Sequence, residues 1–283
     1  MSAANAATVL AACGALGLLA GAVGTFVVAR RRALVADVAA HATLPGACLG
    51  FLASQALGVE GRPMWPILLG AALSALLAAW CVAPLARLRR RGADGATAVA
   101  LAGFFGLGAV LVSLVQTHES GAQGGLRGIL FGNAAGMTAA DLRAILVTCA
   151  LAAAVLVVLF DRLVGTAFDE AHARLAGLPV RALDLVLTML LVATMVAGLQ
   201  TVGVVLVIAL LLAPAAAARQ FTRSVAGNAV AASLLGGACA VAGATLSWQF
   251  ENLPSGATIV LVAAGAFVAA VLLRHAQAWR STP

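Results

Sequence analysis

The chain has 283 residues, of which 63% are hydrophobic and only 10% are charged, and its formal net charge of +7 comes entirely from arginine. A water-soluble domain has about 45–50% apolar and about 25% charged residues, so this composition excludes a soluble enzyme, a secreted disulfide scaffold and a disordered tail. Because one helical span needs about 20 apolar residues, the chain has room for about eight or nine spans and no large extramembrane domain.

The apolar runs predict membrane-spanning helices separated by short polar turns. The first span is expected over residues 9–29, which have no basic residue before them and three arginines after them, unlike a cleaved signal peptide. The following spans are expected at residues 34–58, 64–85, 95–117 and 142–160. Two more lie between Leu183 and Ala218, joined only by residues 199–203, so they form either a tight hairpin or one interrupted helix. The last two are expected at residues 225–248 and 257–273.

The arginines predict the orientation of these spans. They cluster at residues 30–32, 87–91, 162–181, 219–223 and 274–280. If all five clusters are cytoplasmic, only Arg62, Arg127 and Arg143 remain outside, as the positive-inside rule requires. We therefore expect the N-terminus outside and the C-terminus in the cytoplasm. No nucleic-acid role is expected, because interleaved aromatic residues and a dense basic face are both missing.

One ionisable pair is expected within a span. Asp37 is the one carboxylate that falls clearly inside an apolar run, and His41 follows it at i+4 on nearly the same helix face. Because a carboxylate in a bilayer is costly, it usually faces a cavity and has a partner. Pro45 lies four residues after His41 and frees the carbonyl of His41, and Gly46 loosens the backbone further, so a helix break is expected at this site.

A carboxylate oxygen and an imidazole nitrogen suit zinc, manganese or ferrous iron, and they offer nothing soft for copper(I). One chain supplies too few ligands for a closed site, so the pair indicates a transient metal site between two subunits. A structural Asp–His hydrogen bond that orders a kinked helix fits the spacing equally well.

A second constellation occupies residues 168–179. Residues 170–176 are expected to form a short helix, with acidic residues in its first turn and Gly177 ending it. It is too polar to span the membrane, so it is either a cytoplasmic docking helix for a partner or a solvated loop helix. Outside the membrane, His118 and Glu119 do not form a metalloprotease motif, because the second histidine of HExxH is missing. These two residues, with Glu60, Asp141 and Glu251, are interpreted as solvated loop residues.

The sequence resembles the integral-membrane permeases of ABC transporters that import zinc, manganese or iron. Asp37, His41, Pro45 and Gly46 match the family's Asp-x-x-x-His-x-x-x-Pro-Gly signature. The resemblance continues, in family order, through residues 130–133, 168–179, 203–214 and 253–261.

The resemblance implies an all-α polytopic membrane protein with eight to nine transmembrane helices, a type II-like ABC importer permease fold over residues 1–283. It implies that Asp37 and His41 contact the transported metal. It also implies a cytoplasmic coupling helix at about residues 168–179, in which Asp169, Glu170, Ala171 and Gly177 form the coupling pattern.

The implied partners are a cytoplasmic ABC ATPase dimer, an extracytoplasmic metal-binding protein and a second permease subunit, either identical or a paralogue. The expected location is the bacterial inner membrane. The chain has no GxxxxGK[ST] phosphate loop, so ATP hydrolysis is expected in the ATPase subunit and no cofactor is expected to stay bound here. The alternatives are a permease for a metal chelate, a stand-alone secondary metal transporter or channel, and an intramembrane enzyme.

Overall fold

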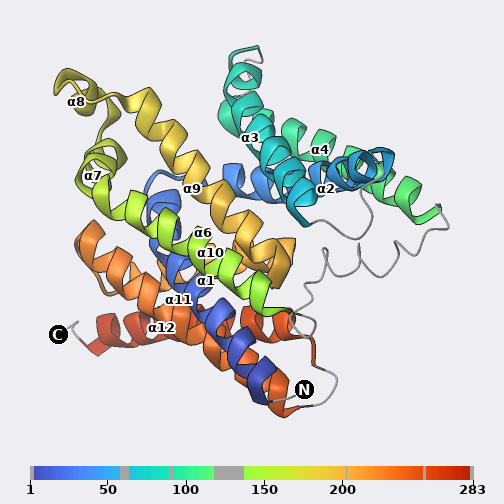
Figure 1. The fold of residues 1–283 in the computed structure, drawn as a ribbon. Coiled ribbons are helices and arrows are strands. Elements are labelled where there is room, and N and C mark those ends of the chain that lie inside the picture. The colour runs from blue at the N-terminus through green and yellow to red at the C-terminus, as the bar shows by residue number, and fades with distance from the viewer. Residues whose placement is uncertain are drawn as a thin grey trace.

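The structure, a computed structural model, describes residues 3–57, 64–88, 92–117, 137–201, 203–250 and 253–280 of the chain. Every regular element within these ranges is a helix (Figure 1). The helices are α1 (Ala3–Ala29), α2 (Ala33–Ala56), α3 (Met64–Leu88), α4 (Gly92–Thr117), α6 (Ala139–Val158), α7 (Phe160–Phe168), α8 (Glu170–Leu175), α9 (Val180–Thr201), α10 (Val204–Ala218), α11 (Val225–Gln249) and α12 (Ser255–Arg280). Outside the described residues lie Glu60, His118, Glu119, Glu251 and the motif at residues 130–133.

Eight of the described helices are long and apolar enough to cross a membrane. They match eight of the nine expected spans, and their ends differ from expectation by a few residues; α2, for example, runs from Ala33 to Ala56 where residues 34–58 were expected. This agreement has a physical cause. In lipid, every backbone polar group must find its partner within the protein, so an apolar run of this length forms a continuous helix.

The expected sixth and seventh spans form a hairpin. α9 ends at Thr201, and Gly203 has a φ of 91°, a backbone conformation that glycine adopts without strain. Asp184, near the start of α9, binds Arg30 beside the end of α1, and Arg219, just after α10, lines a cavity together with Ala29. Both outer ends of the α9–α10 pair therefore lie at the same end of the bundle. The apolar part of α10, Val207–Ala218, is shorter than the other spans.

Glycines allow several pairs of helices to approach closely, among them α1 with α11 and α2 with α3. A Cβ atom added to Gly21 of α1 would lie 2.0 Å from the carbonyl oxygen of Ala232 in α11. A Cβ atom on Gly46 of α2 would lie 2.1 Å from the carbonyl oxygen of Gly70 in α3. Contacts between small residues are typical of helix association in lipid, where packing replaces the hydrophobic effect as the driving force.

The arginines at the end of α1, after α10 and in α12 lie at one end of the bundle, where Arg219, Arg223 and Arg274 line a cavity with Ala29. The polar segment expected at residues 161–181 contains α7 and α8, and α8 contacts Arg30 at the end of α1. Figure 1 shows α8 at the upper left and the N-terminal end of α1 at the opposite, lower end. This arrangement agrees with the alternating route expected from the arginine clusters.

Candidate functional site

The first candidate site is the pair of Asp37 and His41 in the N-terminal half of α2. The Nε2 atom of His41 lies 3.4 Å from the Oδ1 atom of Asp37, and the two side chains are 25% and 33% exposed. The i+4 spacing therefore brings the two groups together as expected. A separation of 3.4 Å is longer than a good N–H···O hydrogen bond, which is about 2.7–3.2 Å.

Neighbouring faces of α2 are packed, and they leave the pair on a partly exposed strip. Val38 and Ala42 are buried in a cluster with residues of α3 and α4. Ala36, Ala39 and Ala40 are buried in the main core. The His41 ring meets the edge of Phe105 from α4, with ring centroids 5.2 Å apart and an interplanar angle of 85°. Packing thus fixes the helix and one side of the imidazole, while the carboxylate of Asp37 and the imidazole of His41 both stay partly exposed.

The spacing of the pair is compatible with two ligands of one metal ion. Two ligand atoms, each about 2.1 Å from a tetrahedral ion, lie about 3.4 Å apart. The Oδ1 atom of Asp37 and the Nε2 atom of His41 have this separation. No group of three or more His, Cys, Asp or Glu side chains suited to a metal occurs in the part of the chain that the structure describes. The pair can therefore supply half of a four-coordinate site and needs further ligands from elsewhere.

The structure corrects the expected helix break at Pro45 and Gly46. α2 continues without interruption through both residues to Ala56. Pro45 still lacks the N–H group that would bond the carbonyl of His41, but one missing hydrogen bond does not interrupt a helix that its neighbours hold. Gly46 also has another role than loosening the backbone, because its missing side chain allows the contact with Gly70.

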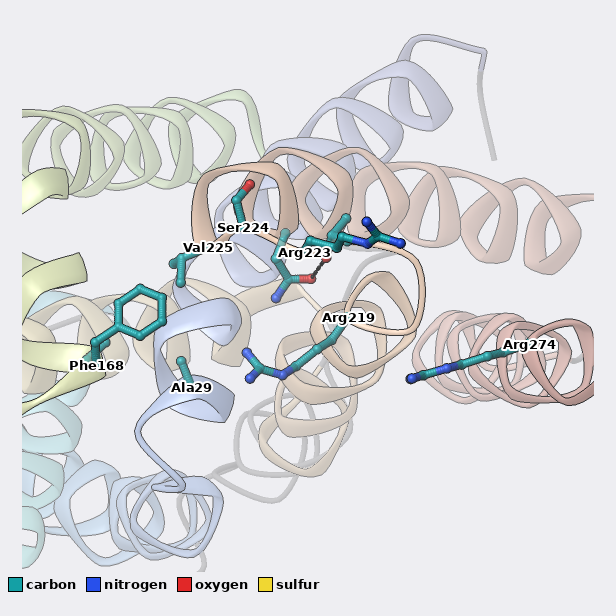
Figure 2. A pocket seen from close by; sticks show the side chains of 10 residues that line it. Ala29, Phe168, Arg219, Arg223, Ser224, Val225 and Arg274 are labelled. Carbon is teal, nitrogen blue, oxygen red and sulfur yellow. Dashed lines mark hydrogen bonds between the residues drawn. The ribbon is translucent and has the colours of Figure 1, made fainter. Parts of the chain in front are cut away.

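A cavity of about 350 Å³ lies elsewhere, at the arginine-rich end of the bundle (Figure 2). Arg219, Arg223 and Arg274 line this cavity. Its lining includes no carboxylate, and His41 is not part of it either. In Figure 2, Arg219 extends from the end of α10 toward the side of Ala29 and Phe168, whereas Arg274 reaches from α12. Three guanidinium groups repel a cation, so this cavity is not a metal site.

The second candidate site is α8, which begins after Asp169 as expected. The Oδ1 atom of Asp169 accepts hydrogen bonds from the backbone N–H groups of Ala171 and His172, at 2.8 and 3.1 Å. These bonds favour the charged carboxylate and lower the pKa of Asp169 below its ordinary value. Asp169 is thus the N-cap of α8.

Gly177 ends α8 with a φ of 76°. The N–H of Gly177 donates to the carbonyl of Arg174, and that of Leu178 donates to the carbonyl of Ala173, which is the Schellman pattern. Capped at both ends, α8 is a defined short helix, and Ala171 and Glu170 are on its exposed surface.

We expect Asp169→Ala to increase hydrogen exchange at the amides of Ala171 and His172, and Asp169→Asn, which keeps an acceptor oxygen, to preserve most of their protection. Because the pKa of Asp169 is lower in the folded chain than in the unfolded chain, the cap is at full strength at neutral pH. It weakens only in acid, as the pH falls below the ordinary value of 3.8. Exchange measured by mass spectrometry at several pH values tests this. Equal protection in the wild type and Asp169→Ala would contradict it.

Two residues that join helices through ion pairs were not singled out from the sequence, Arg30 and Asp184. Arg30 binds Glu170 of α8 and Asp184 of α9, and 3% of its side chain is exposed. Asp184 lies in the second turn of α9, so Asp37 is not the only carboxylate inside a predicted span. Arg30 was interpreted only as a topology signal. Its position at the end of an apolar run, with an acid near the start of another, was the available clue to an ion pair.

Comparison with known proteins identifies the family of the chain. Residues 3–274 match the profile of the ABC 3 transport family. The chain belongs to this family. Its ABC 3 relatives include the manganese transport system membrane protein MntC of Bacillus subtilis (strain 168), 38% identical over 259 residues. That alignment covers 92% of this chain and 58% of the relative, so the chain spans less than two thirds of that protein.

Another relative of this ABC 3 chain is the zinc transport system membrane protein TroC of Treponema pallidum (strain Nichols), 35% identical over 258 residues, or 91% of this chain and 85% of the relative. Among solved structures, PsaBC from Streptococcus pneumoniae in complex with Fab has a TM-score of 0.80 and 30% identity. The match covers 93% of this chain and 89% of that one. The expected family and the all-α polytopic fold are therefore confirmed.

Proposed function

We propose that this ABC 3 family member is the permease subunit of an ATP-driven importer that moves a divalent transition-metal cation across the bacterial cytoplasmic membrane. The observation that carries the proposal is the 3.4 Å separation of Asp37 and His41, on a partly exposed strip of an otherwise packed helix. The relatives named for manganese and zinc transport support a metal cation as cargo. Zinc, manganese and iron all accept an oxygen and nitrogen ligand pair of this kind.

In this mechanism an extracytoplasmic binding protein delivers the cation to two permease subunits, identical or paralogous. Asp37 and His41 of one subunit hold the cation briefly. A second subunit completes the ligand set, because the described part of one chain offers only the pair. ATP binding and hydrolysis in a separate ATPase dimer rock the two subunits against each other. The permease forms one domain over residues 1–283.

In the same mechanism, residues 168–179 form the coupling helix that transmits the movement of the ATPase. Its defined shape supports this role: Asp169 caps the start of α8, and Gly177 turns the chain at its end. Ala171 and Glu170 are exposed on its surface.

Reconstitution tests the function directly. The purified permease is placed in proteoliposomes with and without its ATPase partner, and uptake of radioactive Mn²⁺ or Zn²⁺ is measured with ATP, without ATP and with a non-hydrolysable analogue. We expect uptake only with both the ATPase and hydrolysable ATP. Uptake that persists without an ATPase would identify a stand-alone secondary transporter, and ATP-dependent uptake of a metal chelate but not of the free ion would identify a chelate permease.

The proposed orientation puts the N-terminus outside and the C-terminus, with α8, in the cytoplasm. It is supported by the arginine-rich ends that gather around Arg30. Single cysteines introduced at Ala140 and at Leu175, both exposed, test it in a background without the five native cysteines. In intact cells a membrane-impermeant maleimide is expected to label position 140 and not position 175. Labelling of position 175 and not of position 140 would show that the chain has the opposite orientation in the membrane.

A further inference from the structure

The guanidinium group of Arg30, at the arginine-rich end of the bundle, is almost completely buried. Arg30 follows the last residue of α1, and only 3% of its side chain is exposed. Its Nη2 donates to the Oε1 atom of Glu170 at 2.9 Å, and its Nη1 donates to the Oδ1 atom of Asp184 at 2.6 Å. One planar fork thus binds carboxylates from two other helices, α8 and α9. Such charge-assisted pairs are strong and directional, so the three groups fix one another's positions.

The same arginine begins the turn that leads into α2. Arg31 has a φ of 53°, and the N–H of Arg32 donates to the carbonyl of Val27 at 2.9 Å, so the turn closes α1 in a Schellman pattern. The guanidinium of Arg32 binds Asp184 as well, at 2.5 Å. The turn is therefore held by its own backbone and by α9, and α2 begins directly after it at Ala33.

Asp37 and His41, the proposed metal ligands, lie a short distance along α2. Asp37 lies four positions after Ala33 in the helix, a rise of about 6 Å. We propose that Arg30 is a positioning residue that links α8 to α2, so that movement of the coupling helix sets the position of Asp37 and His41. This inference rests on the proposed function. It changes the role expected for Glu170. In this proposal the carboxylate of Glu170 binds Arg30 and so holds α8 against the end of α1, and it does not bind a residue of the ATPase.

The exposed neighbour of this network supplies a matched control. Arg174 binds the other oxygen of Glu170 at 3.4 Å, and 66% of its side chain is exposed. Exposed ion pairs of this kind contribute little. Arg174→Gln therefore removes one arginine from Glu170 without touching Arg30, whereas Glu170→Gln weakens the pair with the buried side chain of Arg30.

The experiment measures Mn²⁺ uptake and ATP hydrolysis in the same proteoliposomes and reports the number of ions moved per ATP. Glu170→Gln keeps an acceptor oxygen but removes the charge that binds Arg30, and we expect it to lower this ratio about tenfold, the difference between a charged and a neutral hydrogen-bond partner. Because the exposed pair of Arg174 with Glu170 contributes little, we expect Arg174→Gln to keep the number of ions per ATP within about twofold of the wild type, whatever it does to the rates of uptake and hydrolysis through its place on the coupling helix. Arg30→Lys keeps the charge and loses the planar fork, so its ratio is expected to lie between those of the wild type and Glu170→Gln.

The outcomes separate this inference from simpler roles. If uptake and hydrolysis fall together in Glu170→Gln and the ratio stays at the wild-type value, the network is merely structural and the inference is overturned. If the ATPase no longer co-purifies with Glu170→Gln, the carboxylate is an ATPase contact and the inference is also overturned. Glu170 is 44% exposed, so its variant carries the test even if Arg30→Lys does not fold. A wild-type complex without ATP-dependent uptake would instead refute the proposed function itself.

Discussion

Replacement of Asp37 by asparagine or alanine is expected to abolish ATP-driven metal uptake while the complex still assembles. Residues that merely orient metal ligands already cost about 10–100-fold when mutated, so loss of a direct ligand should cost at least as much. Assembly should survive, because the side-chain contact of Asp37 is with His41 of its own helix and the Asp37 side chain is 33% exposed. His41→Gln is expected to have a similar effect. Uptake by reconstituted complexes measures both.

Asparagine separates a metal ligand from a structural pair. Asp37→Asn keeps an oxygen that can accept a hydrogen bond from His41, so a purely structural role predicts nearly normal uptake. The matched control is Asp161→Asn, which changes an exposed carboxylate of α7 and is expected to leave uptake within about twofold of the wild type. Normal uptake by Asp37→Asn would contradict the ligand role, and it would favour a permease whose cargo does not touch this carboxylate.

A second large effect is expected from Gly46→Ala. The added methyl group would lie 2.1 Å from the carbonyl oxygen of Gly70, a backbone atom that cannot move aside without moving α3. Overpacking of this kind typically costs about 1–3 kcal/mol. Thermal unfolding of the protein in nanodiscs should therefore show a lower midpoint, and uptake should fall because α2 carries Asp37.

Gly106→Ala is the matched control for this prediction. It makes the same change in α4, where an added Cβ atom meets nothing within 4 Å. Both variants gain the helix propensity of alanine over glycine, so the difference between them isolates the clash with α3. Equal unfolding midpoints for the two variants would show that α2 and α3 do not make the close contact of Gly46 with Gly70.

Most of the helices could be predicted from the sequence, because lipid makes the local pattern decisive. An apolar run such as residues 34–58 has no stable alternative to a helix, and α2 follows it to within two residues at each end. The Asp37–His41 contact was predictable for the same reason, since an i+4 spacing brings two side chains together on any helix. The short helix α8 was predictable from the acidic residues at its start and from Gly177 at its end, whereas the cap made by Asp169 is seen only in the structure.

Packing between helices was not predictable in the same way. The chain has 30 glycines, and nothing local indicates that Gly46 meets Gly70 or that Gly21 meets Ala232. The effect of Pro45 was overestimated, because the contacts that keep α2 continuous come from other helices. Arg30 shows the same limit, since its two carboxylates lie 140 and 154 residues along the chain. Only the fold reveals that a residue interpreted as a topology signal connects three helices.

The most direct test of the account is to locate the metal. Crystals or frozen particles of the assembled transporter, loaded with Zn²⁺ and trapped by an ATPase variant that binds but does not hydrolyse ATP, would show where the ion lies. We predict the ion at about 2.0–2.2 Å from the Oδ1 atom of Asp37 and from the Nε2 atom of His41, with the remaining ligands from a second subunit or from water. An ion bound elsewhere, with Asp37 and His41 facing only each other, would contradict it.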